Sequence, residues 1–147
     1  MSEASSQDFT FFVDRYLGKR LATVLKAQGL TVEIHDRHFD KNAKDVDWLL
    51  IVGQRGWVVL TKDERIAKRS LERIAVASAQ VRMFVLVSQN LSGTDTAAAF
   101  TKAIAAIQQF LQTHPAPFIA KVYRDGSIAG WKDHQDLLDE LNPPLEK

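Results

Sequence analysis

The chain has 147 residues, of which 46% are hydrophobic and 25% charged, and its formal net charge is +1. This composition is typical of one domain with a sizeable core, and the small charge excludes a protein that coats nucleic acid through a general basic field. The chain lacks cysteine, which excludes disulfides, thiol nucleophiles and cysteine-bound zinc, and no apolar run approaches the roughly 18 residues of a membrane span. Residues 1–8 lack the features of a signal peptide, so we expect a disordered N-terminus followed by a single cytoplasmic domain over 9–147.

Apolar residues recur with two periods along the chain, and the period separates strands from helices. Short unbroken apolar runs, such as residues 57–60, are typical of strands buried on both faces of a parallel sheet. Longer segments with an apolar residue every three or four positions are typical of helices. In chain order, the predicted elements are strand 9–13, helix 17–28, strand 30–35, helix 45–53, strand 57–60, helix 65–76, strand 81–87, helix 94–112, strands 119–123 and 127–131, and helix 133–141.

Repeated alternation of strand and helix predicts a three-layer α/β/α fold with a mainly parallel central sheet. The last two strands flank the sequence Arg-Asp-Gly, which is typical of a hairpin turn. Residues 118–147 are therefore expected to form a small hairpin and helix extension on the same domain, with Pro143 and Pro144 ending its ordered part.

Single residues in these segments carry more specific expectations. Gly29 follows a helix where a left-handed C-cap belongs, and Gly53 is expected to end the next helix. Asp45 is the expected N-cap of that helix, and Asp47 adds negative charge to its first turn, where it suits the helix dipole. In the basic helix, the side chains expected to face the core are Ile66, Leu71, Ile74 and Val76.

Acidic residues gather where the predicted strands end. Asp14, Asp36 and Asp63 follow the first three strands, and Asp45 and Asp47 open a helix that begins at the same edge of the sheet. A turn or a helix cap is the commoner role for any one of them, so the inference depends on their joint placement. Converging carboxylates repel each other unless a cation lies between them, and Mg²⁺ and Mn²⁺ prefer oxygen ligands. A metal held there can activate water and neutralise charge that develops on a phosphodiester.

Several sequence blocks carry a family resemblance. They are Phe-Phe-Val-Asp-Arg-Tyr-Leu-Gly around Asp14, the helix led by Asp45, and Trp-Val-Val-Leu-Thr-Lys-Asp, which contains Thr61 and Asp63. Shorter blocks are His-Asp at 35–36 before Phe39, Gly-x-x-Gly-Trp at 53–57 and His-Pro-x-Pro-Phe at 114–118. Together they resemble the PIN-like domain over about residues 9–125 and, more closely, the group that includes VapC-type ribonuclease toxins.

The resemblance implies an endoribonuclease that uses Mg²⁺ or Mn²⁺ to hydrolyse RNA and is restrained by an antitoxin protein. Asp14, Asp45 and Asp63 are then the catalytic metal ligands. No glutamate occupies the further acidic position of many PIN nucleases, so Asp36 or Asp47 would have to assist. The other supporting residues are Thr61 and Ser88, and the candidate RNA-binding residues are Arg15, Lys62, Arg65, Lys68 and Arg69.

Alternatives remain open for several of these residues. Arg15 either contacts phosphate or pairs with a neighbouring acid, and Lys68 and Arg69 either bind RNA or lie on a solvated helix face. His35 and His38 could be metal ligands themselves. Carboxylate-rich sites rarely need imidazole, so these histidines are instead candidates for supporting the metal ligands. The aromatic residues on predicted apolar faces, expected in the core, are Trp48 and Trp57.

Two other functions compete with RNA cleavage. A PIN-like domain that has lost catalysis would act as an RNA- or protein-binding module. A phosphoacceptor receiver domain is disfavoured, because Arg15 follows Asp14 where that class needs a second acid, and because Lys121 lies inside its strand. A homodimer built through the C-terminal hairpin and helix is also open.

Overall fold

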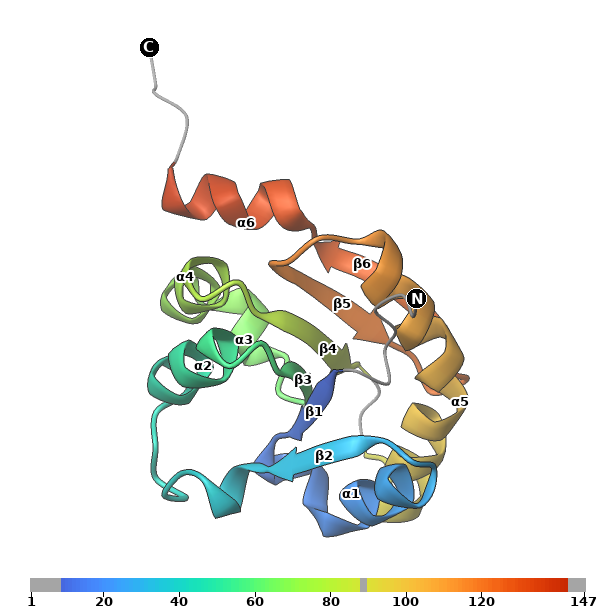
Figure 1. Ribbon diagram of the computed structural model, residues 1–147. Helices are drawn as coiled ribbons and strands as arrows, with labels where there is room; N and C mark the ends of the chain where they lie inside the picture. Colours follow the sequence, from blue (N-terminus) through green and yellow to red (C-terminus); the bar gives the residue numbers. More distant parts are fainter. Residues whose placement is uncertain (1–8, 88–89, 143–147) are drawn as a thin grey trace, which may run out of the picture.

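The computed structural model describes residues 9–87 and 90–142. Over these residues one six-stranded sheet forms, with the strand order β2-β1-β3-β4-β5-β6. Neighbouring strands are parallel except for the antiparallel pair β5 and β6 (Figure 1). This arrangement confirms the mainly parallel α/β sheet expected from the sequence. The strands are β1 (Thr10–Val13), β2 (Thr31–Ile34), β3 (Val58–Thr61), β4 (Arg82–Leu86), β5 (Phe118–Val122) and β6 (Ile128–Lys132).

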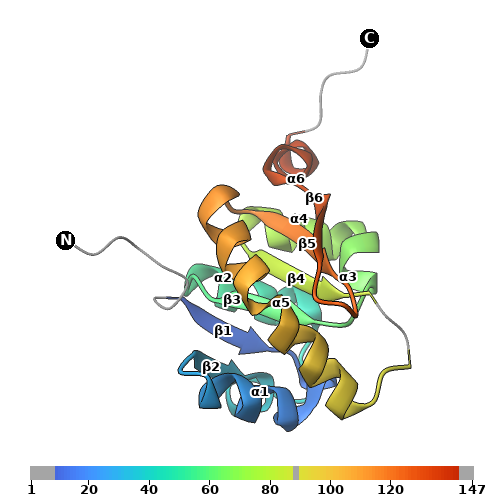
Figure 2. The ribbon, with the colours of Figure 1, turned by 90° about the vertical axis from the view of Figure 1, so that its right-hand side faces the viewer.

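Helices cover both faces of the sheet and complete the three layers. Helices α1 and α5 pack together on one face, whereas α2, α3, α4 and α6 lie on the other (Figures 1 and 2). No helix of the described part of the chain is both long and apolar enough to cross a membrane. The helices are α1 (Gly18–Ala27), α2 (Asp45–Gln54), α3 (Arg65–Lys68), α4 (Ser70–Ser78), α5 (Gly93–Thr113) and α6 (His134–Leu141), with short 3₁₀ turns η2 (Arg15–Leu17) and η3 (His35–Arg37).

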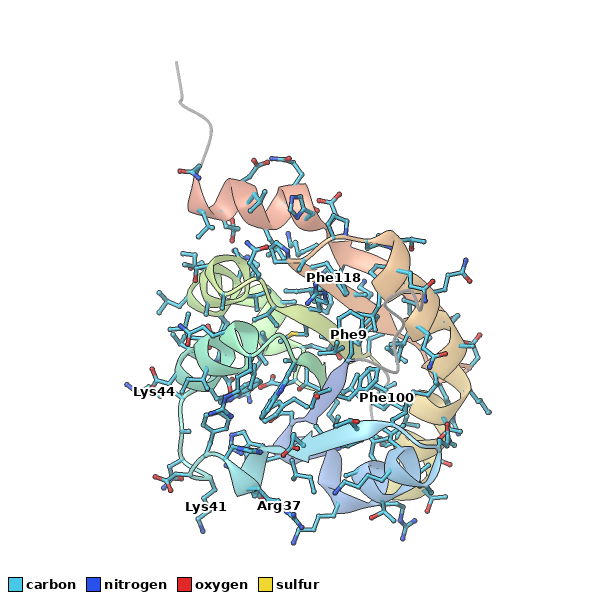
Figure 3. All side chains as sticks on the ribbon, in the orientation of Figure 1. Phe9, Arg37, Lys41, Lys44, Phe100 and Phe118 are labelled. Atoms are coloured by element: carbon cyan, nitrogen blue, oxygen red, sulfur yellow. The ribbon has the colours of Figure 1, made fainter. Side chains whose placement is uncertain are left out.

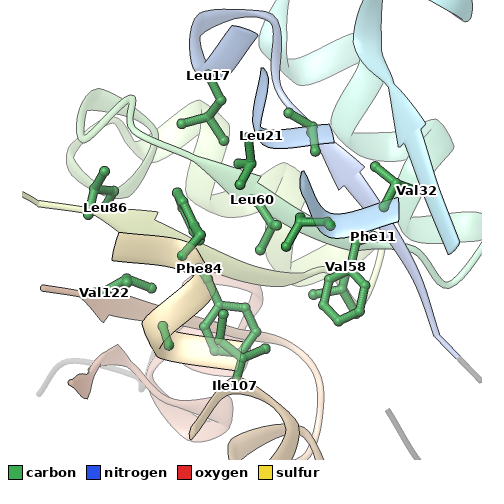
Figure 4. Close-up of a cluster of buried hydrophobic side chains, with 14 of the residues drawn as sticks. Phe11, Leu17, Leu21, Val32, Val58, Leu60, Phe84, Leu86, Ile107 and Val122 are labelled. Atoms are coloured by element: carbon green, nitrogen blue, oxygen red, sulfur yellow. The ribbon is translucent and has the colours of Figure 1, made fainter. Parts of the chain in front are cut away.

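The sequences of the central strands are unbroken apolar runs, because both faces of these strands are buried. In β1, Phe11 and Val13 point into the cluster under α1 and α5, and Phe12 points into the cluster under α2 and α4. Figure 4 shows how Phe11, Val58 and Phe84 from three neighbouring strands meet in the first of these clusters. The sheet is therefore a two-sided core, as a parallel sheet with helices on both faces requires.

The basic segment after β3 forms two helices, so the prediction of a single helix there is wrong. Arg69 has an extended backbone (φ −100°, ψ 130°), which separates α3 from α4. The break changes the phase of the helical face. Ile66 and Val76 are buried as expected, but Leu71 is 70% exposed and Ile74 is also exposed.

Two expectations about α2 are also wrong. Lys44 occupies the N-cap position, and Asp45 is the first helical residue and makes no capping hydrogen bond. Its carboxylate instead accepts a hydrogen bond from the Trp48 indole. Gly53 lies within α2, where an added Cβ would come within 2.5 Å of the Ala79 side chain, so this glycine permits close packing against the turn after α4. Gly29 does have the expected left-handed backbone, with φ 87°.

The C-terminal hairpin is part of the central sheet. Strand β5 pairs in parallel with β4, and β6 adds an antiparallel edge strand beyond it. Helix α6 begins with a capping box between Asp133 and Asp136 and packs on α4. Residues 118–142 therefore continue the sheet and its helical layer, and Pro143 and Pro144 lie outside the described residues.

The strand order places a topological switch point at the carboxyl ends of β1 and β3. The chain leaves β1 through α1 toward β2, and it leaves β3 through α3 and α4 toward β4, on the opposite face. The carboxyl ends of the adjacent strands β1 and β3 thus form a switch point, where open α/β sheets bind their ligands.

Candidate functional site

A buried threonine joins two acidic residues at this switch point. β1 and β3 are in register, and the backbone N–H of Asp14 donates to the Leu60 carbonyl. This pairing brings Asp14 beside Thr61, whose hydroxyl donates a 2.7 Å hydrogen bond to Asp14 Oδ2. The same hydroxyl oxygen accepts from the backbone N–H of Asp63 at 3.0 Å. The Thr-x-Asp sequence thus positions both acids through one side chain.

Asp14 is a buried carboxylate in an unfavourable environment. The residue is 2% exposed. Burial raises its pKa from 3.8 to about 6, although hydrogen bonds from Thr61 and from the Arg15 backbone N–H lower it. The charge of Asp45 raises the pKa of Asp14 further, whereas that of His35 lowers it. The raised pKa shows that the loss of water destabilises the ionised carboxylate more than the surrounding hydrogen bonds stabilise it.

Asp45 lies at the start of α2. Together with Asp14 and Asp63 it forms a set of three acids, called here the acidic group. Its Oδ1 accepts a 2.9 Å hydrogen bond from the Trp48 indole. Burial raises the pKa of Asp45, the negative charges of Asp63 and Glu72 add to this rise, and Arg65 opposes it. Asp45 therefore interacts electrostatically with both Asp14 and Asp63, and the structure brings together the three acids singled out in the sequence.

Asp63 differs from the other two acids because an arginine neutralises it. Arg65 donates from Nε to Oδ1 at 2.9 Å and from Nη2 to Oδ2 at 3.0 Å, a two-bonded ion pair. The backbone N–H of Arg65 donates to Oδ1 as well, at 3.1 Å. The carboxylate of Asp63 is buried, whereas the side chain of Arg65 is 57% exposed.

The three carboxylates supply the oxygen atoms that a hard divalent cation prefers, but they do not form a ready metal site. Over residues 9–87 and 90–142, no three histidine or acidic side chains are arranged to hold a metal ion as they stand. Asp14 and Asp45 supply carboxylate oxygens whose mutual repulsion a cation would relieve. For Asp63 to join such a site, it would have to leave its ion pair with Arg65, and the three carboxylates would have to move closer together.

A pocket of about 500 Å³ opens beside Asp45 and Trp48. Its lining is rich in cations from three segments: Arg15 after β1, Lys41 and Lys44 in the loop before α2, and Arg69 between α3 and α4. Figure 3 shows Lys41 and Lys44 on the loop that leads into α2. Arg15 also donates a hydrogen bond to the Lys41 carbonyl, which ties this loop to the end of β1.

The candidate RNA-binding residues divide into two groups. Arg15 and Arg69 line the pocket, whereas the residues that line it do not include Lys62, Arg65 or Lys68. Arg69 Nη1 lies 3.6 Å from Glu72 Oε2, and Lys68 Nζ lies 4.0 Å from Oε1 of Glu64, the N-cap residue of α3. Lys41 and Lys44 were not singled out in the sequence. The feature of the sequence that could have identified them as RNA-binding candidates is their position in a polar loop just before Asp45.

The remaining supporting candidates are described by their exposure and by the bonds they make. Asp36 is exposed and bonds the ring of His35, and Asp47 is exposed on α2, where its backbone N–H donates to the Lys44 carbonyl. Ser88 lies outside the described residues. His35 is buried and lines the pocket, whereas His38 bonds Glu33 at 2.7 Å.

Comparisons with known proteins identify the family of this chain. The family model described as a PIN like domain matches residues 9–88, which is more than half of the chain. The chain is 26% identical over 117 residues to a protein of Mycobacterium tuberculosis (strain ATCC 25618 / H37Rv) named "Putative ribonuclease VapC45", covering 76% of this chain and 84% of that protein. A search of solved structures finds no significant match. The resemblance drawn from the sequence is confirmed, and the chain belongs to the PIN-like domain family.

Proposed function

We propose that this protein is a divalent-metal-dependent endoribonuclease that hydrolyses RNA phosphodiester bonds. We further propose that it is the toxin of a toxin–antitoxin pair, held inactive in the cytoplasm by an antitoxin protein. Membership of the PIN-like family supports the nuclease, and the name of the mycobacterial relative supports a ribonuclease.

The observation that carries the proposal is the acidic group formed by Asp14, Asp45 and Asp63 at the switch point. These residues lie far apart in sequence. Burial is the main cause that raises the pKa of Asp14 and of Asp45, and the charge of Asp45 adds to the first rise and that of Asp63 to the second. Structural caps need no such mutual repulsion. A site that binds a cation does need it, because the same charges hold the cation in place.

Each residue has a distinct role in the proposed reaction. Asp14, Asp45 and Asp63 would hold Mg²⁺ or Mn²⁺, which when bound supplies charge neutralisation on the phosphodiester and a more acidic water. Thr61 fixes the position of Asp14 and of the Asp63 backbone. The pocket cations Arg15, Lys41, Lys44 and Arg69 would contact the phosphate backbone of RNA, which holds the strand without reading its sequence.

The test is cleavage of end-labelled RNA by the purified chain, with Mn²⁺ or with EDTA. We expect the parent to cleave with Mn²⁺ alone and Asp14→Asn to lose cleavage while keeping its fold by circular dichroism. Asp139→Asn is the matched control, because this aspartate is exposed on α6 and its described side-chain bond is to Gln135, remote in sequence from the acidic group. Full activity in Asp14→Asn would contradict the assignment. A parent that binds RNA without cutting it would identify a binding module instead.

The proposed antitoxin has a separate test. Expression of the chain alone should arrest bacterial growth, and co-expression of a small protein from a neighbouring reading frame should restore it. Arrest that persists in Asp14→Asn would show that RNA cleavage is not its cause.

A further inference from the structure

We propose that His35 is a catalytic residue of this site: its Nε2 atom donates the proton that the leaving oxygen takes when the RNA bond breaks, and Asp36 positions it. This inference rests on the proposed ribonuclease function. It adds a residue type that the acidic group cannot replace, because ionised carboxylates have no proton to give.

The ring of His35 is held in a fixed position by aromatic side chains. It is 1% exposed. Its centroid lies 6.0 Å from that of Phe12, 5.5 Å from that of Phe39 and 5.8 Å from that of Trp48, which meets it edge to face. Burying a polar ring among apolar ones costs free energy, which an aliphatic residue at the same position would avoid. The imidazole is therefore better explained by its chemistry than by packing.

The two ring nitrogens of His35 have different surroundings. Nδ1 lies 3.3 Å from Asp36 Oδ1, and the side chain of Asp36 is 55% exposed. Among the described residues, the hydrogen bond that the His35 ring makes is the one at Nδ1, which leaves Nε2 for a ligand in the pocket that His35 lines. A carboxylate at Nδ1 fixes the orientation of a histidine and makes Nε2 the reactive atom.

His35 lines the same pocket as Asp45 and the four pocket cations. The cations would draw a phosphodiester into the pocket and place it against the lining that contains His35. Water would be activated at the acidic group while His35 serves the bond that breaks. This separation gives each end of the reaction its own group.

The proposed step balances in atoms and charge. The oxygen of a water molecule bonds to phosphorus, and the bond from phosphorus to the leaving ribose oxygen breaks with its electron pair going to that oxygen. The leaving oxygen takes the proton from His35 Nε2 and becomes a hydroxyl group. Neutral His35 then regains through solvent the proton that the attacking water released.

The test uses two RNA substrates that differ at one atom. In the second, sulfur replaces the leaving bridging oxygen, which is identified beforehand from the ends of the cleavage products. A thiolate leaves without needing a proton, so a general acid matters for the oxygen substrate alone. We expect His35→Gln to cleave the oxygen substrate about 10²–10⁴-fold more slowly and the sulfur substrate less than about tenfold more slowly.

His114→Gln is the matched control, because this exposed histidine follows α5, its Nδ1 lies 2.9 Å from Thr113 Oγ1, and it is not among the residues that line the pocket. It should cleave both substrates at parental rates. Asp36→Asn provides a second variant that should fold normally, because its side chain is exposed. We expect it to slow the oxygen substrate about tenfold and to leave the sulfur substrate unchanged.

Each outcome decides the inference. Equal losses on both substrates in a folded His35→Gln variant would overturn it, as would parental cleavage of the oxygen substrate. If His35→Gln does not fold, Asp36→Asn decides by the same comparison. A parent that cleaves neither substrate would overturn the proposed ribonuclease function as well, whereas a cleaving parent with an equally active His35→Gln overturns this inference alone.

Discussion

The two faces of the sheet are built by different rules. The face under α1 and α5 is a continuous apolar cluster in which the helical positions Leu21, Leu25, Phe100 and Ile107 are all buried. The face under α2, α3 and α4 combines an apolar cluster with His35, Asp45 and Arg69 along the pocket. The difference indicates that the α1/α5 face mainly supplies stability, and that the α2/α4 face gives up some of it for the site.

Asp14 and Thr61 lie where the two faces meet, at the ends of the central strands. There the chain buries a carboxylate whose pKa rises to about 6 chiefly because water is removed from it. Violations of ordinary patterning are expected to gather at functional positions. The predictions below test this contrast, from the largest expected effect to the smallest.

The largest effect is expected on the α1/α5 face. Phe100 is fully buried in α5, so Phe100→Ala should lower the free energy of unfolding by about 3–5 kcal/mol through the cavity it leaves. Denaturation in urea measures the change. Mn²⁺ affinity of the folded fraction should stay at the parental value, and a parallel loss of metal binding would show that the two faces are not separate.

The next effect has the opposite sign. In EDTA near neutral pH, Asp14→Asn should raise the free energy of unfolding by up to about 3 kcal/mol, the cost of ionising a carboxyl whose pKa is 3.8 unfolded and about 6 folded. The folded state binds the extra proton between these pH values, so the parent loses stability as pH rises from about 4 to 6. The variant has no such loss, and the difference between the two should vanish below about pH 4.

Urea denaturation across this pH range measures the gain from Asp14→Asn. Asp63→Asn is the matched comparison, because Arg65 already neutralises Asp63 and its replacement removes an ion pair. It should give no gain. If the free energy of unfolding of the parent and of Asp14→Asn changed in parallel with pH, burial would not destabilise the ionised form of Asp14.

Sequence reasoning worked where the chain is regular and failed where the site interrupts it. The apolar period of α5 and the unbroken runs of β1 and β3 define their buried faces directly, and Asp14, Thr61 and Asp63 could be placed because strand ends share an edge. The break at Arg69 could not be predicted, because no glycine or proline lies in this segment of the sequence. The capping role given to Asp45 failed because the Trp48 indole, one helical turn away, takes the carboxylate oxygen.

A smaller effect is expected at the ion pair between Arg65 and Asp63. Arg65→Gln should tighten Mn²⁺ binding about three- to tenfold, because the metal no longer competes with a two-bonded arginine and meets less positive charge. Calorimetric titration of the metal measures the change. Lys68→Gln removes the same charge from the same helix without touching Asp63, and it should shift affinity less than twofold. Equal effects would assign the change to general charge alone.

The smallest effect is expected at Leu71, where two models of the basic segment disagree most. One continuous helix would point this side chain at the core, and Leu71→Gln would then cost several kcal/mol. The observed break leaves it 70% exposed, so the free energy of unfolding should change by no more than about 0.5 kcal/mol. Because Leu71 also lines the pocket, RNA affinity measured on the same variant gives a second reading. Weaker RNA binding at unchanged stability would show that the break at Arg69 turns an apolar side chain from the core toward the ligand, whereas a large loss of stability would restore the single helix.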